Sequence, residues 1–471
     1  MKKIDERSLF IALAFSFIFA LAGSLVSVIR YWQYEVFYYD FGIFDKAIWG
    51  VSRFSLPIIH HIELGEKIIF ADHFSPSIFI LSPLFWIFPW SETLLVAQAS
   101  MVAGSGFVLL LIGKRVLKNS FYAMTIMLCY FLFEGLQNGV ITDFHEVSIA
   151  TLFFMLSFFC VVAKKKKLYF LFLFLLLGCK ETMFLLGVGI AVTLFLIFPK
   201  WRKIALATCI ISLMWGILSI KIIIPFFSGG TYLYATGIPT DPIAIVSSFF
   251  DNQIKRRTLF YTFLNFGFLP LLSPGFWFLI FQDFLVRFYP QAFIARWALG
   301  FHYSMLTTTI MAVSSVFSIQ ILQRYLKQKY LTILIFLLLL NSLFLYRAVL
   351  HGPFSLAYNS ALYAHTKDFA FLDTAIKKIP KNASVMTQNN ILPHFTHQKS
   401  WLLISDIYRY NGEYYTLQQP DYILIDNRSG QNSNNYYGVS DMQFLLTNLQ
   451  KDTSYTNMYR QGDLWIFRKI E

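Results

Sequence analysis

Long apolar runs alternate with short polar or basic segments from residue 9 to residue 348. A helix needs roughly 20 apolar residues to cross a bilayer, and many of these runs reach or approach that length. Several are shorter, which indicates tilted helices or a locally thin membrane. The pattern predicts eleven membrane spans, at about 9–29, 93–113, 121–138, 147–163, 168–179, 183–199, 204–226, 258–270, 275–288, 303–322 and 330–348.

One further apolar segment, 75–90, is interrupted by three prolines. If it crossed the membrane, the basic cluster "GKRVLK" would lie outside, against the tendency of lysine and arginine to stay in the cytoplasm. As an interfacial or re-entrant helix, it leaves every basic cluster except "KRR" (255–257) inside. This topology predicts a cytoplasmic N-terminus and an extracytoplasmic tail.

The tail has the pattern of a small soluble α/β domain. Short apolar runs bounded by turn residues are typical of buried strands, and two longer amphipathic runs are typical of helices. We therefore expect a transmembrane domain at 1–350, with a first outer loop at about 30–92, and a soluble domain at 351–471. The expected strands lie at 383–387, 400–405, 421–426 and 464–470, and the expected helices at 365–380 and 441–450.

Composition supports this organisation and excludes other classes. Hydrophobic residues make up 56% of the chain and charged residues only 14%, against about 25% charged in soluble proteins. The net charge of +13 comes from clusters between apolar runs, so it indicates cytoplasmic loops and not nucleic-acid binding. All four cysteines lie in apolar runs without a CxxC motif, so neither a zinc site nor a disulfide framework is indicated.

Polar side chains near membrane segments are costly and are therefore functional candidates. In the predicted topology nearly all of them gather on the outer side, whereas the cytoplasmic loops carry mostly lysine and arginine. This asymmetry predicts a cavity open to the outer face. The candidates are Asp40, Asp45, Asp72, His73, Asp143, His145, Glu146, Lys180, Glu181, Arg287, Arg296 and His302.

Asp40 precedes a segment in which Phe41, Phe44 and Ile48 recur at helical spacing. This spacing predicts an amphipathic helix on the membrane surface, with Asp40 as its N-cap. Asp45 points roughly 140° away around that helix. Asp40 is either a simple cap or a general base that takes a proton from an acceptor hydroxyl, and Asp45 is either a solvated charge or an acceptor ligand.

The next candidates have both structural and functional readings. Asp72 could orient His73, both could bind an acceptor or a metal, or Asp72 could cap a loop boundary. Asp143, His145 and Glu146 immediately precede a predicted helix. Capping explains one of these acids, and acceptor binding is the alternative.

The remaining candidates include most of the basic side chains on the predicted outer side of the membrane. Lys180 and Glu181 either neutralise each other or leave Lys180 to bind phosphate. Arg287 and Arg296 are candidate phosphate ligands, because guanidinium binds phosphate oxygens in bidentate fashion. His302 is either structural or part of the same phosphate site.

Several motifs, "YDFGIFDKAIWG", "DHFSPSIFILSPLFWIFP", "DFHEVS", "CKETMFLLGVGIAV" and "HYSM", resemble those of a bacterial and archaeal membrane-protein family known as domain of unknown function 2079. That family is similar to the GT-C superfamily of glycosyltransferases, which use polyprenyl-phosphate-linked sugars. The resemblance implies that Asp40 is the first-loop catalytic acid, with Asp45 as its rival. His73 and Pro76 match a His-Pro-Pro segment, although the adjacent proline pair is missing.

The resulting expectation is an inverting glycosyltransferase in a bacterial or archaeal cytoplasmic membrane. It would transfer a sugar from a polyprenyl-phosphate donor to a glycan, glycolipid or protein acceptor on the outer face. Asp40 would act as the base, and the cations would stabilise the leaving phosphate. No spacing demands a metal, and a divalent ion remains an option. The alternatives are a transporter or lipid flippase, for which inverted repeats would be expected, and a non-catalytic glycolipid-binding scaffold.

Overall fold

The computed structural model describes residues 6–230, 232–234, 241–289, 293–364, 367–404 and 419–470. The chain forms two compact units. The helical unit comprises Met1–Ser27, Phe70–Ile78 and Leu95–Tyr358, and the α/β unit comprises Val28–Ile69, Phe79–Leu94 and Asn359–Glu471. Most of the predicted first outer loop therefore belongs to the same unit as the tail. The predicted domain boundary at residue 350 stays a prediction.

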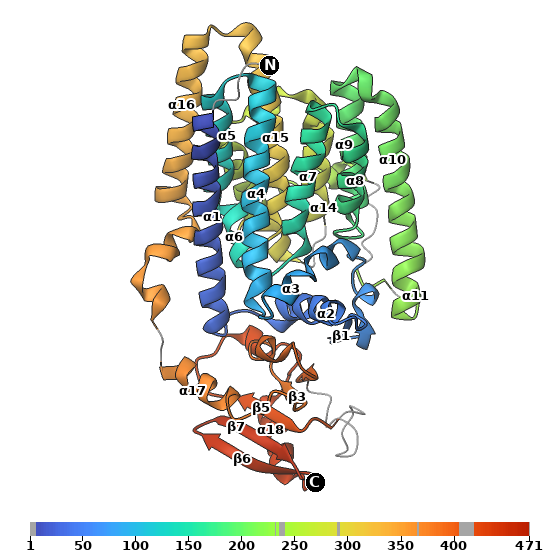
Figure 1. Ribbon diagram of the computed structural model, residues 1–471, viewed down its shortest axis with the longest axis vertical. Coiled ribbons are helices and arrows are strands. Elements are labelled where there is room, and N and C mark those ends of the chain that lie inside the picture. Colours follow the sequence, from blue (N-terminus) through green and yellow to red (C-terminus); the bar gives the residue numbers. More distant parts are fainter. Residues whose placement is uncertain are drawn as a thin grey trace. The chain divides into compact units, whose positions relative to one another are not determined.

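Each predicted span overlaps a helix or a pair of consecutive helices (Figure 1). Most of their bounds lie within a few residues of the predicted runs, whereas the helix Gln253–Asn265 begins five residues before the predicted span at 258–270. The helices are α1 (Glu6–Trp32), α4 (Glu92–Leu117), α5 (Ser120–Leu132), α6 (Glu134–Ile141), α7 (Glu146–Val162), α8 (Lys166–Leu177), α9 (Met183–Ile197), α10 (Arg202–Ile217), α11 (Ile224–Ser228), α12 (Pro242–Ser247), α13 (Gln253–Asn265), α14 (Trp277–Phe288), α15 (Ser304–Tyr325) and α16 (Gln328–Phe344).

Length separates these helices into two groups. Among the described residues, five continuous helical segments are long and apolar enough to cross a membrane, and α5 with α6 forms a sixth candidate that bends by 53°. α7 and α9 are shorter apolar helices. These helices establish a multi-pass membrane protein, whereas the number of eleven spans stays a prediction.

α15 is the central helix of the helical unit. It packs against α5, α6, α7 and α14 (Figure 1), and nearly all of its residues from Ser304 to Ile319 are buried. Several of its hydroxyl groups are satisfied within the helix. Thr308, for example, donates to the carbonyl oxygen of Ser304 at 2.6 Å. Such bonds let polar residues occupy an apolar interior without leaving donors unsatisfied.

The α/β unit contains a five-stranded sheet in the order β4-β3-β5-β7-β6 (Figure 1). β3, β4 and β5 are parallel, and β7 runs antiparallel to β5 and pairs with β6 in a hairpin. The elements are β3 (Val385–Thr387), β4 (Ser400–Leu402), β5 (Tyr422–Asp426), β6 (Tyr455–Gln461), β7 (Leu464–Lys469), α17 (Lys367–Ile376) and α18 (Met442–Lys451).

The four predicted strands and two predicted helices of the tail are confirmed, although residues 365, 366 and 405 lie outside the described residues. Apolar side chains of β3, β5 and β7, including Met386, Ile423 and Phe467, form a core with those of α18. The sequence did not predict β6, because this edge strand is mostly polar and largely exposed. Its strand conformation is stabilised by backbone hydrogen bonds to β7.

The first outer loop forms more structure than its sequence predicted. A π-helical turn, Tyr38–Gly42, leads into α2 (Ile43–Ser52), and a hairpin of β1 (Ile58–His61) and β2 (Gly65–Ile68) follows. The predicted helix is present, but two details were wrong. Asp40 lies inside the π-helical turn and is not a cap, since Phe37 occupies the N-cap position. The apolar face of the helix, including Phe41, Phe44 and Ile48, is buried in the protein and does not face lipid.

The proline-interrupted segment forms a 3-10 helix, Pro76–Leu81, followed by α3 (Leu84–Ile87). Together they are too short to cross a bilayer, which needs roughly 20 residues. Several large apolar side chains here are exposed, among them Trp86, Ile87 and Trp90. Tryptophan is enriched at the membrane interface, so this geometry fits the predicted interfacial or re-entrant helix.

Candidate functional site

Basic side chains converge on a cavity of about 130 Å³ in the helical unit. Lys180 comes from the connection between α8 and α9, Arg287 from the last turn of α14, and Arg296 and His302 from the segment before α15. These are the four basic residues that the sequence suggested for phosphate binding. The structure brings all of them together, with Asp283 and Tyr303 also in the wall.

Arg287 is fixed by neighbouring oxygens. Its guanidinium donates to the hydroxyl groups of Thr307 at 2.8 Å and Ser304 at 3.1 Å, and to the carbonyl oxygen of Arg296 at 3.1 Å. Thr307 in turn donates to the carboxylate of Asp283. Asp283 was not among the predicted site residues, although an acid four residues before an arginine in an apolar helix is itself a signal.

Lys180 forms an ion pair with Glu146, the first residue of α7, with 2.6 Å between Nζ and Oε1. One of the two predicted alternatives was that Lys180 and Glu181 neutralise each other. Their direct partners differ, since Lys180 pairs with Glu146 and Glu181 with His73. Burial alone would lower the pKa of the Lys180 ammonium, but the Glu146 carboxylate reverses this and raises the pKa above its ordinary value. Lys180 is thus a cation at neutral pH.

Glu181 binds His73 instead. The Nδ1 atom of His73 lies 3.0 Å from Oε1 of Glu181, and the hydroxyl of Tyr232 donates to the same oxygen at 2.9 Å. Burial would lower the pKa of His73, but the Glu181 carboxylate outweighs it and raises that pKa. Burial would raise the pKa of Glu181, and His73 outweighs this and lowers it. Both shifts favour the charged forms of the two side chains.

Asp72 accepts a hydrogen bond from the hydroxyl of Tyr234 at 2.7 Å. The Tyr234 ring also stacks on His73, with 4.4 Å between ring centroids. The carboxylate bonded to Nδ1 of His73 is that of Glu181, whereas the sequence suggested Asp72 as the group that orients this ring. Tyr232 and Tyr234 were missed, because nothing in their local sequence distinguishes them from other loop tyrosines.

His302 stacks on His145, with only 3.4 Å between ring centroids. Burial lowers the pKa of His302 far below its ordinary value, and the neighbouring His145 and Lys180 lower it further. His302 is therefore a neutral imidazole and not a cation. Its buried Nδ1 atom has no hydrogen-bond partner among the described residues.

The predicted capping of α7 by an acid is wrong. The N-cap is His145, without a side-chain cap bond. The buried Asp143 adopts a left-handed backbone with φ of 51°, and its carbonyl oxygen accepts from the amide of Gln98 at 2.6 Å. Gln98 also accepts from the backbone N–H of His145 at 3.0 Å. Gln98 therefore positions this turn, and Glu146 is left to bind Lys180.

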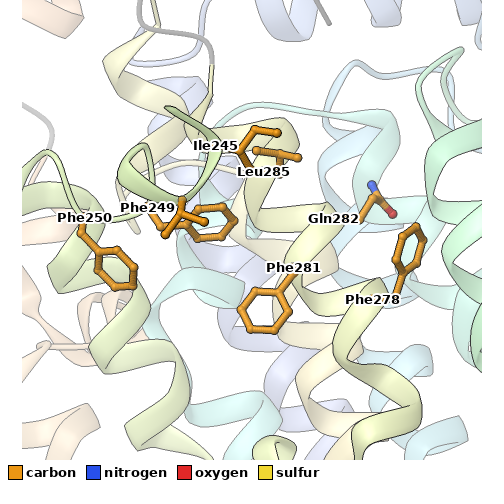
Figure 2. Close-up of a pocket in the computed structure, with 8 residues that line it drawn as sticks. Ile245, Phe249, Phe250, Phe278, Phe281, Gln282 and Leu285 are labelled. Carbon is orange, nitrogen blue, oxygen red and sulfur yellow. The ribbon is translucent and has the colours of Figure 1, made fainter. Parts of the chain in front are cut away.

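An apolar cavity of about 410 Å³ adjoins the basic one, and Gln282 lines both. Figure 2 shows its wall, in which side chains of α14 face those of α12 and the residues after it. The rings of Phe249 and Phe281 lie 6.2 Å apart between centroids. The lining residues are Ile245, Val246, Phe249, Phe250, Phe278, Phe281, Gln282 and Leu285.

The two acids of the first outer loop have different environments within the α/β unit. Asp45 is fully buried and binds His397, with 3.0 Å between Oδ2 and Nε2. The same oxygen accepts from Ser91 at 2.8 Å and from Thr396. The reading of Asp45 as a solvated charge is wrong, and its burial among protein donors favours a structural role.

Asp40 is half-buried. Its charge acts on Tyr437, whose pKa is raised mainly by burial and further by the carboxylates of Glu63 and Asp40. The Tyr437 ring lies 4.8 Å from that of Tyr39, and the Tyr39 hydroxyl lies 3.2 Å from Nε2 of His61. Asp40 therefore lies near polar and aromatic side chains and is only partly buried.

Within the described ranges, no group of three or more His, Cys, Asp or Glu side chains has the arrangement of a metal site. Glu146 and Glu181, two of the acids of the helical unit, are bound to different bases, Lys180 and His73. Metal dependence stays an open expectation.

The apolar helices and the basic and apolar cavities belong to a multi-pass membrane protein. In a comparison with solved structures, the chain resembles the crystal structure of ArnT from Cupriavidus metallidurans bound to undecaprenyl phosphate. The TM-score is 0.54 at 9% sequence identity, and the match covers 99% of each chain. No curated protein matches the sequence.

The chain belongs to the family of predicted membrane proteins described as DUF2079, whose model matches residues 30–464. The match covers the predicted first outer loop, the apolar helices from α4 onward and nearly all of the tail. Family membership and fold agree with the resemblance seen in the sequence motifs.

Proposed function

We propose that the protein transfers a sugar from a polyprenyl-phosphate donor to an acceptor hydroxyl on the outer face of the membrane. The observation that carries the proposal is the basic cavity of the helical unit. Among the described residues, buried Nε of Arg296 and Nδ1 of His302 have no protein partner. Buried polar atoms are normally hydrogen-bonded, so unpaired nitrogens in a basic cavity suit an anionic ligand such as a phosphate.

The adjoining apolar cavity suits the hydrocarbon chain of the same donor. A phosphate bound by Lys180 and Arg296 would place its lipid chain beside Gln282, where the wall changes from polar to aromatic. Undecaprenyl phosphate, the ligand in the ArnT structure, has this combination of an anionic head and an apolar tail. A soluble nucleotide sugar would leave the apolar wall without a partner.

The proposed reaction is a single displacement. The acceptor oxygen attacks the anomeric carbon while Asp40 takes the proton of the acceptor hydroxyl. The bond from the anomeric carbon to the phosphate oxygen breaks, and polyprenyl phosphate leaves with the electron pair. Lys180, Arg287 and Arg296 would stabilise the charge on that phosphate. Attack from the face opposite the leaving group inverts the anomeric carbon.

The donor site can be tested by titrating the purified protein with undecaprenyl phosphate and following binding by native mass spectrometry. The Arg296→Gln variant should bind roughly 10-fold to 100-fold more weakly, since hydrogen bonds to charged groups contribute about 1.5–3 kcal/mol. Arg324→Gln, near the C-terminal end of α15 and outside the cavity lining, is the matched control. Equal affinity of both variants would remove the proposed phosphate site. Binding without any transfer activity would favour the carrier or scaffold alternatives.

A further inference from the structure

Asn389 of the α/β unit contacts the turn that contains Asp40. It lies two residues after β3, at the carboxyl end of the parallel strands. Its side-chain oxygen accepts from the backbone N–H of Tyr39 at 3.0 Å, and its carbonyl oxygen accepts from the backbone N–H of Tyr38 at 2.8 Å. One residue thus binds the two peptide groups immediately before Asp40.

The first N–H groups of a helix have no acceptor within the helix. A capping side chain usually accepts one of them, but Phe37 at the N-cap of the π-helical turn provides none. Asn389, more than 300 residues away in the chain, supplies two acceptors for these groups. The first turn around Asp40 is therefore capped by the tail.

Asn389 is itself held firmly. Its backbone N–H donates to the carbonyl oxygen of Asn435 at 3.1 Å, and its side-chain amide donates to that of Asn434 at 2.9 Å. The residue is only 3% exposed. With all of these groups bonded, a rotation of Asn389 would break several hydrogen bonds, so the position of the turn follows the position of the sheet.

We propose that Asn389 is a positioning residue for Asp40, so that the tail domain sets the geometry of the catalytic carboxylate. The inference rests on the proposed function, in which Asp40 is the general base. A base acts only when it reaches the proton to be removed, and a displacement of about 1 Å can reduce a rate roughly 100-fold. The tail is then part of the catalytic apparatus in addition to any role in acceptor binding.

The test compares transfer rates in membranes from a deletion strain that carries one variant at a time. The donor is the lipid-linked sugar fraction extracted from that strain, and its concentration is varied. Asn389→Ala should lower kcat roughly 10-fold to 100-fold with an unchanged KM for the donor, because the donor site is elsewhere. Asn389→Asp keeps an acceptor for the N–H of Tyr39 and should recover part of the rate.

Thr387→Val is the matched control for a general disturbance of the sheet. Thr387 is buried in the same strand region, and its hydroxyl donates to the carbonyl oxygen of Leu424 in the neighbouring strand at 2.8 Å. Equal loss of rate in Thr387→Val and Asn389→Ala would overturn the inference, as would a wild-type rate in Asn389→Ala. Asp40→Asn in the same assay separates the two proposals. If Asp40→Asn is inactive while Asn389→Ala has the wild-type rate, only the positioning role of Asn389 is contradicted. If Asp40→Asn is active, the role of Asp40 as the base is contradicted, and with it the positioning role of Asn389.

Discussion

The ammonium of Lys180 lies 2.6 Å from the carboxylate of Glu146, although the next residue along the chain is itself an acid. The adjacent Glu181 binds His73 instead. These two ion pairs lie next to the first residues of α7 and α9. They connect three segments of the helical unit that are far apart in the sequence, those of His73, Glu146 and Lys180. Lys180 belongs to one of these pairs and also lines the basic cavity.

Loss of the Glu146 charge should destabilise the helical unit. Removing one partner of a buried pair typically costs about 3–5 kcal/mol, because the other charge is left unpaired. Glu146→Gln should therefore lower the thermal unfolding midpoint in detergent micelles, and Glu146→Leu combined with Lys180→Met should recover much of it. Glu35→Gln, which disrupts the exposed pair with Arg30, should change stability by less than about 1 kcal/mol. An unchanged midpoint in Glu146→Gln would contradict the buried pair.

The His73–Glu181 pair predicts a pH dependence of stability. His73 has a raised pKa, so its contribution is complete below the ordinary histidine pKa and is lost as pH rises through the raised value. Glu181 has a lowered pKa, so its contribution is complete above the ordinary glutamate pKa and is lost as pH falls through the lowered value.

The pair should therefore stabilise most between about pH 4.3 and pH 6.5, the ordinary values of the two groups. Unfolding midpoints measured from pH 5 to pH 9 should fall for the wild type at the alkaline end. His73→Gln should lack that component of the decrease. A parallel profile for both proteins would show that the pair does not contribute.

Asp45→Asn should act on stability and not directly on chemistry. The substitution removes the charge that binds His397 and weakens the bonds from Ser91 and Thr396. Hydrogen bonds to charged groups contribute about 1.5–3 kcal/mol, so a loss of that order is expected in denaturant unfolding. Asp40→Asn, at a half-buried position, should leave unfolding within about 0.5 kcal/mol of the wild type. A reversed order would mean that the roles of the two acids were exchanged.

Phe281→Ala should weaken binding of undecaprenyl phosphate and leave binding of inorganic phosphate unchanged. Phe281 lines the apolar cavity beside Phe249 (Figure 2), and the loss of its ring removes apolar contact area worth about 1.5–3 kcal/mol when fully buried. A decrease of roughly 10-fold in lipid affinity is expected. Phe226→Ala, at a highly exposed position of α11 outside that cavity, is the control. Equal effects of both variants would count against a lipid-chain site.

The apolar helices and the buried strands could be predicted from the sequence because buried segments need apolar residues, which form long or regularly spaced apolar runs. The runs at 303–322 and 421–426, for example, became the buried α15 and β5. Strands that are stabilised mainly by hydrogen bonds to a neighbouring strand have a weaker sequence pattern. β6 is a polar edge strand, and the hairpin of β1 and β2 is bounded by no strong turn pair, so both were missed.

The same division holds for the candidate site. That Lys180, Arg287, Arg296 and His302 share one cavity followed from the topology, because charged residues gathered on one side of the predicted membrane. Their partners did not follow. The choice of Glu146 over Glu181 by Lys180, and the burial of Asp45 against His397, depend on distances between segments far apart in the sequence. No local pattern encodes such distances.

The central claim is that the protein transfers a sugar with Asp40 as the base. Its most direct test is mass spectrometry of lipid-linked and envelope glycans in a deletion strain that carries either the wild type or Asp40→Asn, with equal amounts of folded protein in the membrane. We expect that the wild type restores a glycan product and that Asp40→Asn leaves its lipid-linked precursor untransferred. The same glycans from Asp40→Asn as from the wild type would contradict it.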